Sequence, residues 1–122
     1  MKKLAASPAI VSGIKLVTAR VDGLASQDAR VLADGIRQML GSGVVVFGRA
    51  DGDKASLLVA VTDDLKPKLP AGDLVKELAA IIGGGGGGRP DLAEAGGKDP
   101  SRLDEALRAA SAAVARRAGG AA

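Results

Sequence analysis

The chain has 122 residues, 17 of them basic and 14 acidic, with one phenylalanine and no tryptophan, tyrosine, histidine or cysteine. These absences exclude a zinc site, a Ser-His-Asp triad and a cysteine nucleophile, and they leave almost no aromatic surface for stacking on nucleic-acid bases. The length is that of one domain, and the net charge of +3 leaves any nucleic-acid contact to a local basic patch.

No stretch of the sequence indicates export or a membrane span. The apolar runs are shorter than the roughly 18 residues that cross a bilayer, and the N-terminus lacks the continuous apolar region of a signal peptide. The absence of cysteine is compatible with a reducing compartment. We therefore expect a cytoplasmic domain without membrane contact.

The first part of the chain predicts a strand followed by a helix. Residues 14–21 alternate between apolar and polar side chains, which is typical of a half-buried strand. The segment 26–40 predicts an amphipathic helix with Ser26 as its N-terminal cap and Gly41 as its terminator. We expect Met39 to fill the core as part of the buried stripe of this helix.

The middle of the chain predicts an antiparallel hairpin, and two helices follow. An apolar run over 44–47 and a strand over 54–62 flank an Asp-Gly-Asp turn. The next helix is expected to end at Gly83, and Asp99 with Pro100 starts the last one. The resulting order predicts an α+β (mixed α/β) fold, a sheet of about three to five strands covered by three helices.

The predicted globular domain extends over residues 13–118. Residues 1–12 are expected to be a flexible leader or the stub of an upstream helical segment, and residues 119–122 a frayed tail. A glycine-rich loop over 83–97 lies inside the globular domain.

That loop, GGGGGGRPDLAEAGG, is the most unusual stretch of the chain. Each ordered glycine costs about 0.5–1 kcal/mol relative to alanine, so six in a row predict either a flexible linker or a backbone shape that other residues cannot adopt. An ordered loop has three interpretations: nucleotide binding, phosphate recognition on a larger polymer, or close approach of two helices to the sheet. Because the run follows a helix and lacks Gly-Lys-Ser/Thr, it matches neither a Rossmann turn nor a Walker loop.

Phosphate recognition requires cations near the glycines, and the sequence offers three. Arg89 follows the run directly, and Lys98 and Arg102 follow the loop. Arg89 and Arg102 also have an alternative interpretation as solvated surface charges: Arg89 paired with Asp91 or Glu94, and Arg102 paired with Asp104 or Glu105. The candidate phosphate or tRNA contacts are Gly84, Gly86, Gly87, Gly88, Arg89, Lys98 and Arg102.

The pattern GG-x-GGG-RPD-x-A-x-A-GG resembles the signature of the C-terminal domain of alanyl-tRNA synthetase, which belongs to the DHHA1-type domains that follow DHH-type phosphoesterases. The phosphoesterase relatives usually carry histidine where Arg89 stands here, which favours the synthetase branch. Two positions depart from the signature: Glu94 replaces the expected glutamine, and Gly85 stands where lysine is often found. Both changes weaken the attraction for an anion.

The resemblance implies a non-catalytic module that contacts the elbow of tRNA(Ala) and helps to couple aminoacylation with editing. It places ATP, Mg and Zn in upstream domains, so we expect no cofactor and no catalytic residue in this segment. The implied partners are tRNA(Ala), the upstream domains of the same synthetase and, in a homodimer, a second copy. The alternatives are a protein-interaction or dimerisation module and the substrate-binding domain of a DHH-type phosphoesterase.

Overall fold

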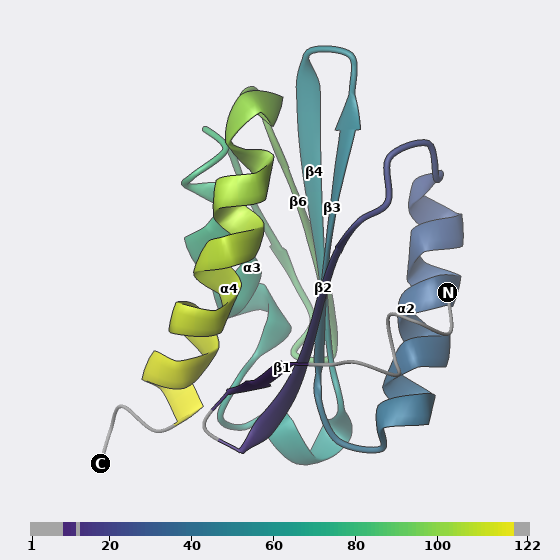
Figure 1. Ribbon diagram of the computed structural model, residues 1–122, viewed down its shortest axis with the longest axis vertical. Coiled ribbons are helices and arrows are strands. Elements are labelled where there is room, and N and C mark those ends of the chain that lie inside the picture. The colour runs from purple at the N-terminus through teal and green to yellow at the C-terminus, as the bar shows by residue number, and fades with distance from the viewer. Residues whose placement is uncertain (1–8, 12, 119–122) are drawn as a thin grey trace.

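A six-stranded mixed sheet forms the centre of the computed structural model, which describes residues 9–11 and 13–118 (Figure 1). Its strands are β1 (Ala9–Val11), β2 (Ile14–Arg20), β3 (Val44–Asp51), β4 (Lys54–Val61), β5 (Gly85–Gly88) and β6 (Leu92–Gly97). They lie in the order β1-β2-β3-β4-β6-β5. The α+β class is confirmed, but the sheet exceeds the predicted three to five strands because 9–11 and 85–88 form strands that the sequence pattern does not predict.

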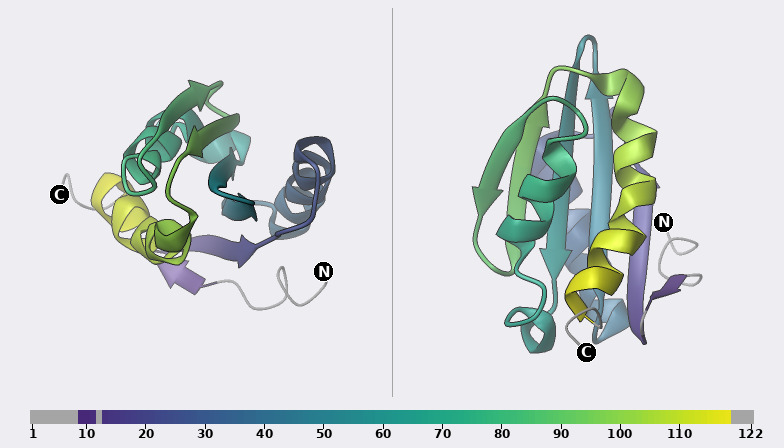
Figure 2. Two further views of the ribbon diagram at one scale, coloured as in Figure 1. Left: turned by 90° about the horizontal axis from the view of Figure 1, so that it is seen from above. Right: turned by 90° about the vertical axis from the view of Figure 1, so that its left-hand side faces the viewer.

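The helices of the described chain cover both faces of the sheet, as Figure 2 shows. Helix α2 (Ser26–Leu40) packs on one face, and α3 (Ala71–Ala79) and α4 (Leu103–Ala118) pack on the other. Short 3-10 turns at Asp63–Leu65 and Pro100–Arg102 precede α3 and α4. The predicted number of three covering helices is confirmed.

Strand β3 separates two hydrophobic cores because alternate residues of a strand point to opposite faces. Val44 and Val46 pack with α3 and α4, whereas Val45 and Phe47 pack against α2. Each of these four side chains is at most 1% exposed, which confirms the prediction of a strand buried on both faces. The predicted hairpin from β3 to β4 is also present, with Gly52 in the left-handed region at its turn.

The start of α2 differs from the prediction. Ala25 precedes the helix in an extended conformation, and no side chain caps the helix. The Ser26 hydroxyl instead donates to a Glu94 oxygen at 2.6 Å. The prediction that Ser26 is the cap is therefore wrong, because its hydroxyl serves a tertiary contact. Gly41 ends the helix with a φ of 72°, as predicted.

The prediction that Met39 fills the core is also wrong, since its side chain is 64% exposed. Each residue turns an α-helix by about 100°, so Met39 faces away from the sheet when the next residue, Leu40, points into the core. The buried face of α2 is made by Ala29, Ala33, Ile36 and Leu40.

The glycine run starts by closing α3. The α-helical part ends at Ala79, and tight turns lead to Gly83, which has a φ of 70°. The Gly84 N–H then donates to the Ala79 carbonyl at 3.0 Å, the longer hydrogen bond of a Schellman motif. The prediction that this run begins as a helix terminator is confirmed, although the regular helix ends earlier than Gly83.

The start of the last helix follows the prediction. Asp99 accepts a hydrogen bond from the Ser101 N–H at 3.2 Å, and Pro100 occupies the first helical position. At the other end, Arg116 and Arg117 both pair with Glu77 of α3. These ion pairs hold α4 against α3 on the same face of the sheet.

The predicted leader over 1–12 is described only at 9–11, which pair with β2 at one edge of the sheet. The predicted helical stub within 1–8 and the frayed tail at 119–122 lie outside the described residues. No helix in the described ranges is long and apolar enough to cross a membrane.

Candidate nucleic-acid interface

The glycine-rich stretch is a β-hairpin at the free edge of the sheet and not a loop. Strand β5 pairs antiparallel with β6, which lies between β5 and β4 (Figure 2, right). Arg89, Pro90 and Asp91 form the connection, closed by a hydrogen bond of 3.1 Å from the Arg89 N–H to the Leu92 carbonyl. The predicted loop over 83–97 is therefore corrected to an edge hairpin, because β6 offers the run a partner that local sequence does not reveal.

Close packing explains three of the six glycines. A Cβ on Gly84 would lie 1.8 Å from the Gly96 carbonyl oxygen, one on Gly86 would lie 2.4 Å from the Glu94 carbonyl oxygen, and one on Gly88 would lie 2.8 Å from the Ala93 Cα. These are backbone atoms and cannot swing away. A glycine backbone at alternate positions is thus a condition for pairing β5 with β6.

Two other glycines have no such role. A Cβ on Gly85 would meet no atom within 4 Å, and one on Gly87 would meet only the end of the Lys76 side chain, at 3.2 Å. Gly85 is exposed and Gly87 is partly exposed, so neither residue covers the backbone of this edge strand with a side chain of its own. Unpaired edge N–H groups are then accessible to an acceptor such as a phosphate oxygen.

A cavity of about 370 Å³ lies between the hairpin and α2. We call it the hairpin groove, and its lining is Arg30, Gly87, Gly88, Arg89, Leu92, Ala93 and Glu94. It joins the predicted residues Gly87, Gly88 and Arg89 to Arg30, which comes from α2. The groove therefore combines glycine backbone with two guanidinium groups, a pairing suited to anions.

Glu94, one of the two departures from the family signature, is neutralised inside this groove. Its carboxylate accepts the hydrogen bond from Ser26 and pairs with the Arg30 guanidinium. The Glu94 side chain is 27% exposed and that of Arg30 is 52% exposed. About half of the Arg30 side chain thus remains accessible to solvent, so a second acceptor can approach it.

Arg89 is the most exposed of these cations, with 75% of its side chain accessible. Its nearest carboxylate is that of Asp91, at 3.6 Å, and Glu94 has other partners. An exposed pair at this distance contributes at most about 1 kcal/mol, so the Arg89 side chain is available to another anion at little cost.

Lys98 and Arg102 lie at the far end of the hairpin from Arg89. The Lys98 N–H donates to the Ile82 carbonyl, and Arg102 pairs with Glu105 through two hydrogen bonds. These bonds raise the pKa of Arg102 and lower that of Glu105. At about 3.3 Å per residue, β6 separates the two ends by roughly 17 Å. The structure therefore divides the predicted contacts into two groups.

Two cations lie near the glycines in the fold, although the sequence does not predict this proximity. Arg30 reaches the groove from α2, and Lys76 reaches Gly87 from α3. Among the described residues Lys76 forms no ion pair. We call Arg30, Lys76 and Arg89 the basic edge. No sequence signal brings these residues together, because each belongs to a different element.

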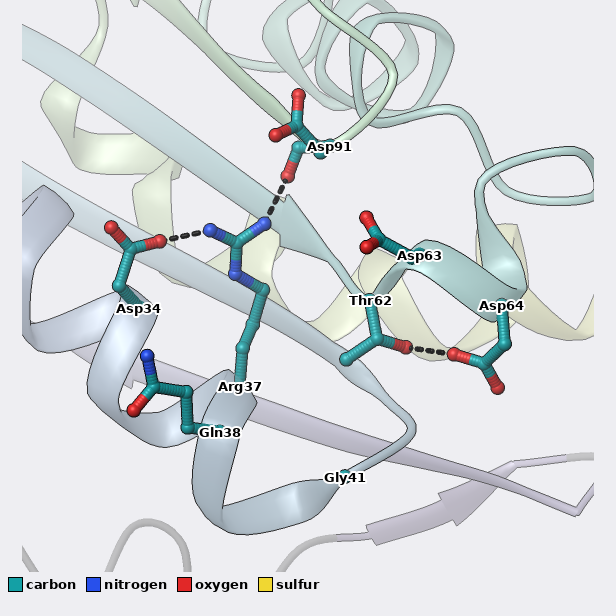
Figure 3. A pocket seen from close by; sticks show the side chains of 8 residues that line it. All are labelled: Asp34, Arg37, Gln38, Gly41, Thr62, Asp63, Asp64 and Asp91. Atoms are coloured by element: carbon teal, nitrogen blue, oxygen red, sulfur yellow. Dashed lines mark hydrogen bonds and ion pairs between the residues drawn. The ribbon is translucent and has the colours of Figure 1, made fainter.

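A second, larger cavity of about 700 Å³ has the opposite charge (Figure 3). Four aspartates and one arginine line it together with three neutral residues: Asp34, Arg37, Gln38, Gly41, Thr62, Asp63, Asp64 and Asp91. The surplus of carboxylates repels phosphate, so this cavity is a poor site for nucleic acid. Within the described ranges, no group of carboxylates is arranged to hold a metal ion.

Arg37 in this cavity positions the turn that carries Arg89. Its guanidinium donates to the Asp91 carbonyl at 2.9 Å and pairs with Asp34 (Figure 3). It also donates to the Val61 carbonyl at 3.2 Å. One side chain thus joins α2, the end of β4 and the Arg-Pro-Asp turn.

Comparisons with known proteins place the chain in a family. Residues 13–116 match the family model of the DHHA1 domain. The alanine–tRNA ligase of Acetivibrio thermocellus is 52% identical over 101 residues, and that of Anaeromyxobacter dehalogenans is 51% identical over 113 residues. These alignments cover 82% and 93% of this chain but only 12% of each ligase.

A solved structure gives the same result for the fold. The crystal structure of the C-Ala domain from Aquifex aeolicus alanyl-tRNA synthetase superposes with a TM-score of 0.83 at 29% identity. The match covers 89% of this chain and 98% of that one. The family expected from the glycine signature is confirmed, and the chain belongs to the DHHA1 domain family.

Proposed function

We propose that this chain is the C-terminal tRNA-binding module of an alanine–tRNA ligase, without catalytic activity of its own. The similarity to the C-Ala domain and to the two ligases supports the proposal that the chain is part of an alanine–tRNA ligase. The observation that carries the proposal is the basic edge, which places Arg30, Lys76 and Arg89 around the glycine backbone of β5. In this account the domain holds the elbow of tRNA(Ala) and helps to couple aminoacylation with editing.

The chemistry of the edge suits an RNA backbone. Guanidinium, ammonium and backbone N–H groups are the usual donors to phosphate oxygens, and such contacts position a protein without reading sequence. Folded RNA is recognised largely by shape and through its backbone. With almost no aromatic residues, the domain has no stacking platform for single-stranded bases.

The division of the predicted contacts favours a polymer over a small ligand. Arg89 and the pair Lys98 and Arg102 lie roughly 17 Å apart along β6, which one phosphoester or mononucleotide does not span. An RNA backbone with many phosphates touches both groups. We therefore rank tRNA binding above the substrate-binding role of a phosphoesterase domain, with Lys98 and Arg102 as a second, weaker contact.

The proposal is tested by titrating fluorescently labelled tRNA(Ala) with wild-type protein and with Arg89→Ala. We expect Arg89→Ala to weaken binding several-fold, because a charge-assisted contact contributes about 1–3 kcal/mol. Arg108→Ala, which removes an exposed cation from α4, is the matched control and should bind like wild type. If the Arg89 variant and wild type bind tRNA(Ala) with equal affinity, the basic edge is not the contact surface.

A further inference from the structure

A third cavity, of about 490 Å³, lies where the hairpin of β3 and β4 extends beyond the first turn of α2 (Figure 1). Both strands of this hairpin and residues 23–25, which lead into α2, line it. We call it the β3–β4 cavity. Its charged lining residues are Arg49, Asp51 and Lys54. The cavity therefore has two positive charges against one negative charge.

Arg49 is partly buried but has no anionic partner in the described part of the chain. It follows Phe47 by two residues, so it lies on the same face of β3, past the point where α2 covers the sheet. Its guanidinium donates to the Leu24 carbonyl at 2.7 Å and forms no ion pair. A partly buried charge is normally paired, so Arg49 retains the capacity to hold an external anion.

The other charges around the cavity leave it open to an anion. Lys54 is exposed and, among the described residues, forms no ion pair. Asp51 is the carboxylate of the lining, and it reduces the attraction without cancelling it. Asp22, next to the lining, is paired with Arg20, and Asp28 in the first turn of α2 lies outside the lining. One surplus cation suits a secondary contact within a larger interface.

A row of paired residues joins this cavity to the glycine hairpin. Gly85 pairs with Gly96, Gly96 pairs with Ser56, and Ser56 pairs with Arg49. Residues opposite one another share a face of the sheet, so these four lie in line across β5, β6, β4 and β3. A Cβ on Gly85 would meet no atom within 4 Å, and one on Gly96 would meet only the Ala55 carbonyl oxygen, at 3.8 Å. The row thus contains no carboxylate and no bulky side chain before Arg49.

We propose that Arg49 and Lys54 bind a further phosphate of the RNA that is held at the basic edge, whose backbone crosses the sheet along this row. This inference rests on the proposed function. Three strand spacings separate β5 from β3, about 14 Å, which a polymer spans and a single phosphate group does not. Lys98 follows Gly97, the partner of Ala55, and so lies at the same end of the sheet as Lys54.

The salt dependence of tRNA(Ala) binding tests this path with Lys54→Ala. This variant removes an exposed cation without an ion pair in the described ranges, so the fold should persist. We expect its affinity to fall about two- to fivefold and the slope of log affinity against log salt to fall in magnitude by about 0.7–0.9. Lys68→Ala, an exposed lysine beyond the opposite end of β4, is the matched control and should keep the wild-type slope.

Two substitutions of Arg49 separate its charge from its packing. Arg49→Met keeps most of the side-chain length and should lose the same part of the slope, whereas Arg49→Lys keeps the charge and should retain it. Wild-type slopes for both Lys54→Ala and Arg49→Met would overturn the path. If Arg89→Ala still weakens binding in that case, the proposed function stands.

Two further outcomes would also overturn the inference. An equal loss of slope in Lys68→Ala would indicate an effect of net charge and not a local contact. A wild-type chain that does not bind tRNA(Ala) would contradict both the path and the proposed function.

Discussion

At the residue scale, the glycine run contains positions of two kinds. Gly84, Gly86 and Gly88 are required by backbone atoms of β6, whereas Gly85 lies in open space. Composition alone treats these glycines as equivalent. The difference appears only when the neighbouring strand is in place, and it separates positions that maintain the fold from positions that expose the backbone.

This difference predicts opposite effects for two alanine substitutions. Gly86→Ala places a Cβ 2.4 Å from the Glu94 carbonyl oxygen and should lower the free energy of unfolding by about 1–3 kcal/mol or more. Gly85→Ala meets nothing and should be neutral or stabilise by about 0.5 kcal/mol, since it restricts the unfolded chain. Urea denaturation measures both, and equal destabilisation would contradict the close packing described for β5 and β6.

A substitution of Glu94 should change the affinity for tRNA(Ala) in the direction opposite to Arg89→Ala. Glu94→Gln removes the negative charge that pairs with Arg30 while it retains a partner for Ser26. In the proposed function, the freed guanidinium should strengthen tRNA binding by about two- to tenfold, or roughly 0.5–1.4 kcal/mol. Anisotropy titration of the variant and wild type at one salt concentration makes the comparison. Weaker binding by Glu94→Gln would place the RNA away from Arg30.

The hydrogen bonds of the Asp64 carboxylate predict that the stability of the domain depends on pH. Hydrogen bonds from Ser42 and Thr62 favour its charged form and lower its pKa in the folded state. A lowered carboxyl pKa contributes stability above the unfolded pKa of about 3.9, and this contribution is lost as the pH falls through the folded value. The difference in melting temperature between wild type and Asp64→Asn should therefore be larger at pH 7 than at pH 3. A difference that does not change with pH would contradict the role of the charge.

At the scale of elements, the hairpin depends on α2 as much as on its own strands. Arg37 of α2 holds the Asp91 and Val61 carbonyls, and Ser26 and Arg30 hold Glu94 of β6. The position of the basic edge relative to the sheet is thus set from a helix that lies far away in sequence.

This arrangement predicts a stability cost for Arg37→Ala that exceeds the cost of an ordinary surface substitution. Its guanidinium makes two hydrogen bonds to backbone carbonyls and is only 19% exposed, so its removal should cost about 1–3 kcal/mol. The tRNA affinity should fall as well, because the Arg-Pro-Asp turn loses its anchor. Urea denaturation and titration give the two values; Gln38→Ala, exposed on the same helix, is the control. An unchanged unfolding midpoint for Arg37→Ala would contradict the anchoring role.

Elements with a strong local pattern were predictable from the sequence. The alternation of β2, the apolar run of β3 and the cap at Asp99 each determine structure through neighbours in the chain. Strand β5 was not predictable, because glycine has a poor strand propensity and no side chain to show a period. The same limit applies to Ser26, whose hydroxyl fits a helix cap locally but bonds to Glu94 in the folded chain.

At the scale of the whole molecule, charge is distributed unevenly. The basic edge lies around β5, and the acidic cavity opens on the other side of the Arg-Pro-Asp turn, with Asp91 in its lining. A net charge of +3 does not reveal this division. The signature indicated Arg89 and the glycine backbone, but Arg30 and Lys76 join them only through tertiary packing.

The salt dependence of tRNA(Ala) binding tests the central claim most directly. Each phosphate contact contributes about 0.7–0.9 to the slope of log affinity against log salt concentration. The triple variant Arg30→Ala/Lys76→Ala/Arg89→Ala should bind more weakly than wild type, with a slope reduced in magnitude by about 2–3. A variant with the wild-type slope and affinity would show that the basic edge makes no contact with the phosphates.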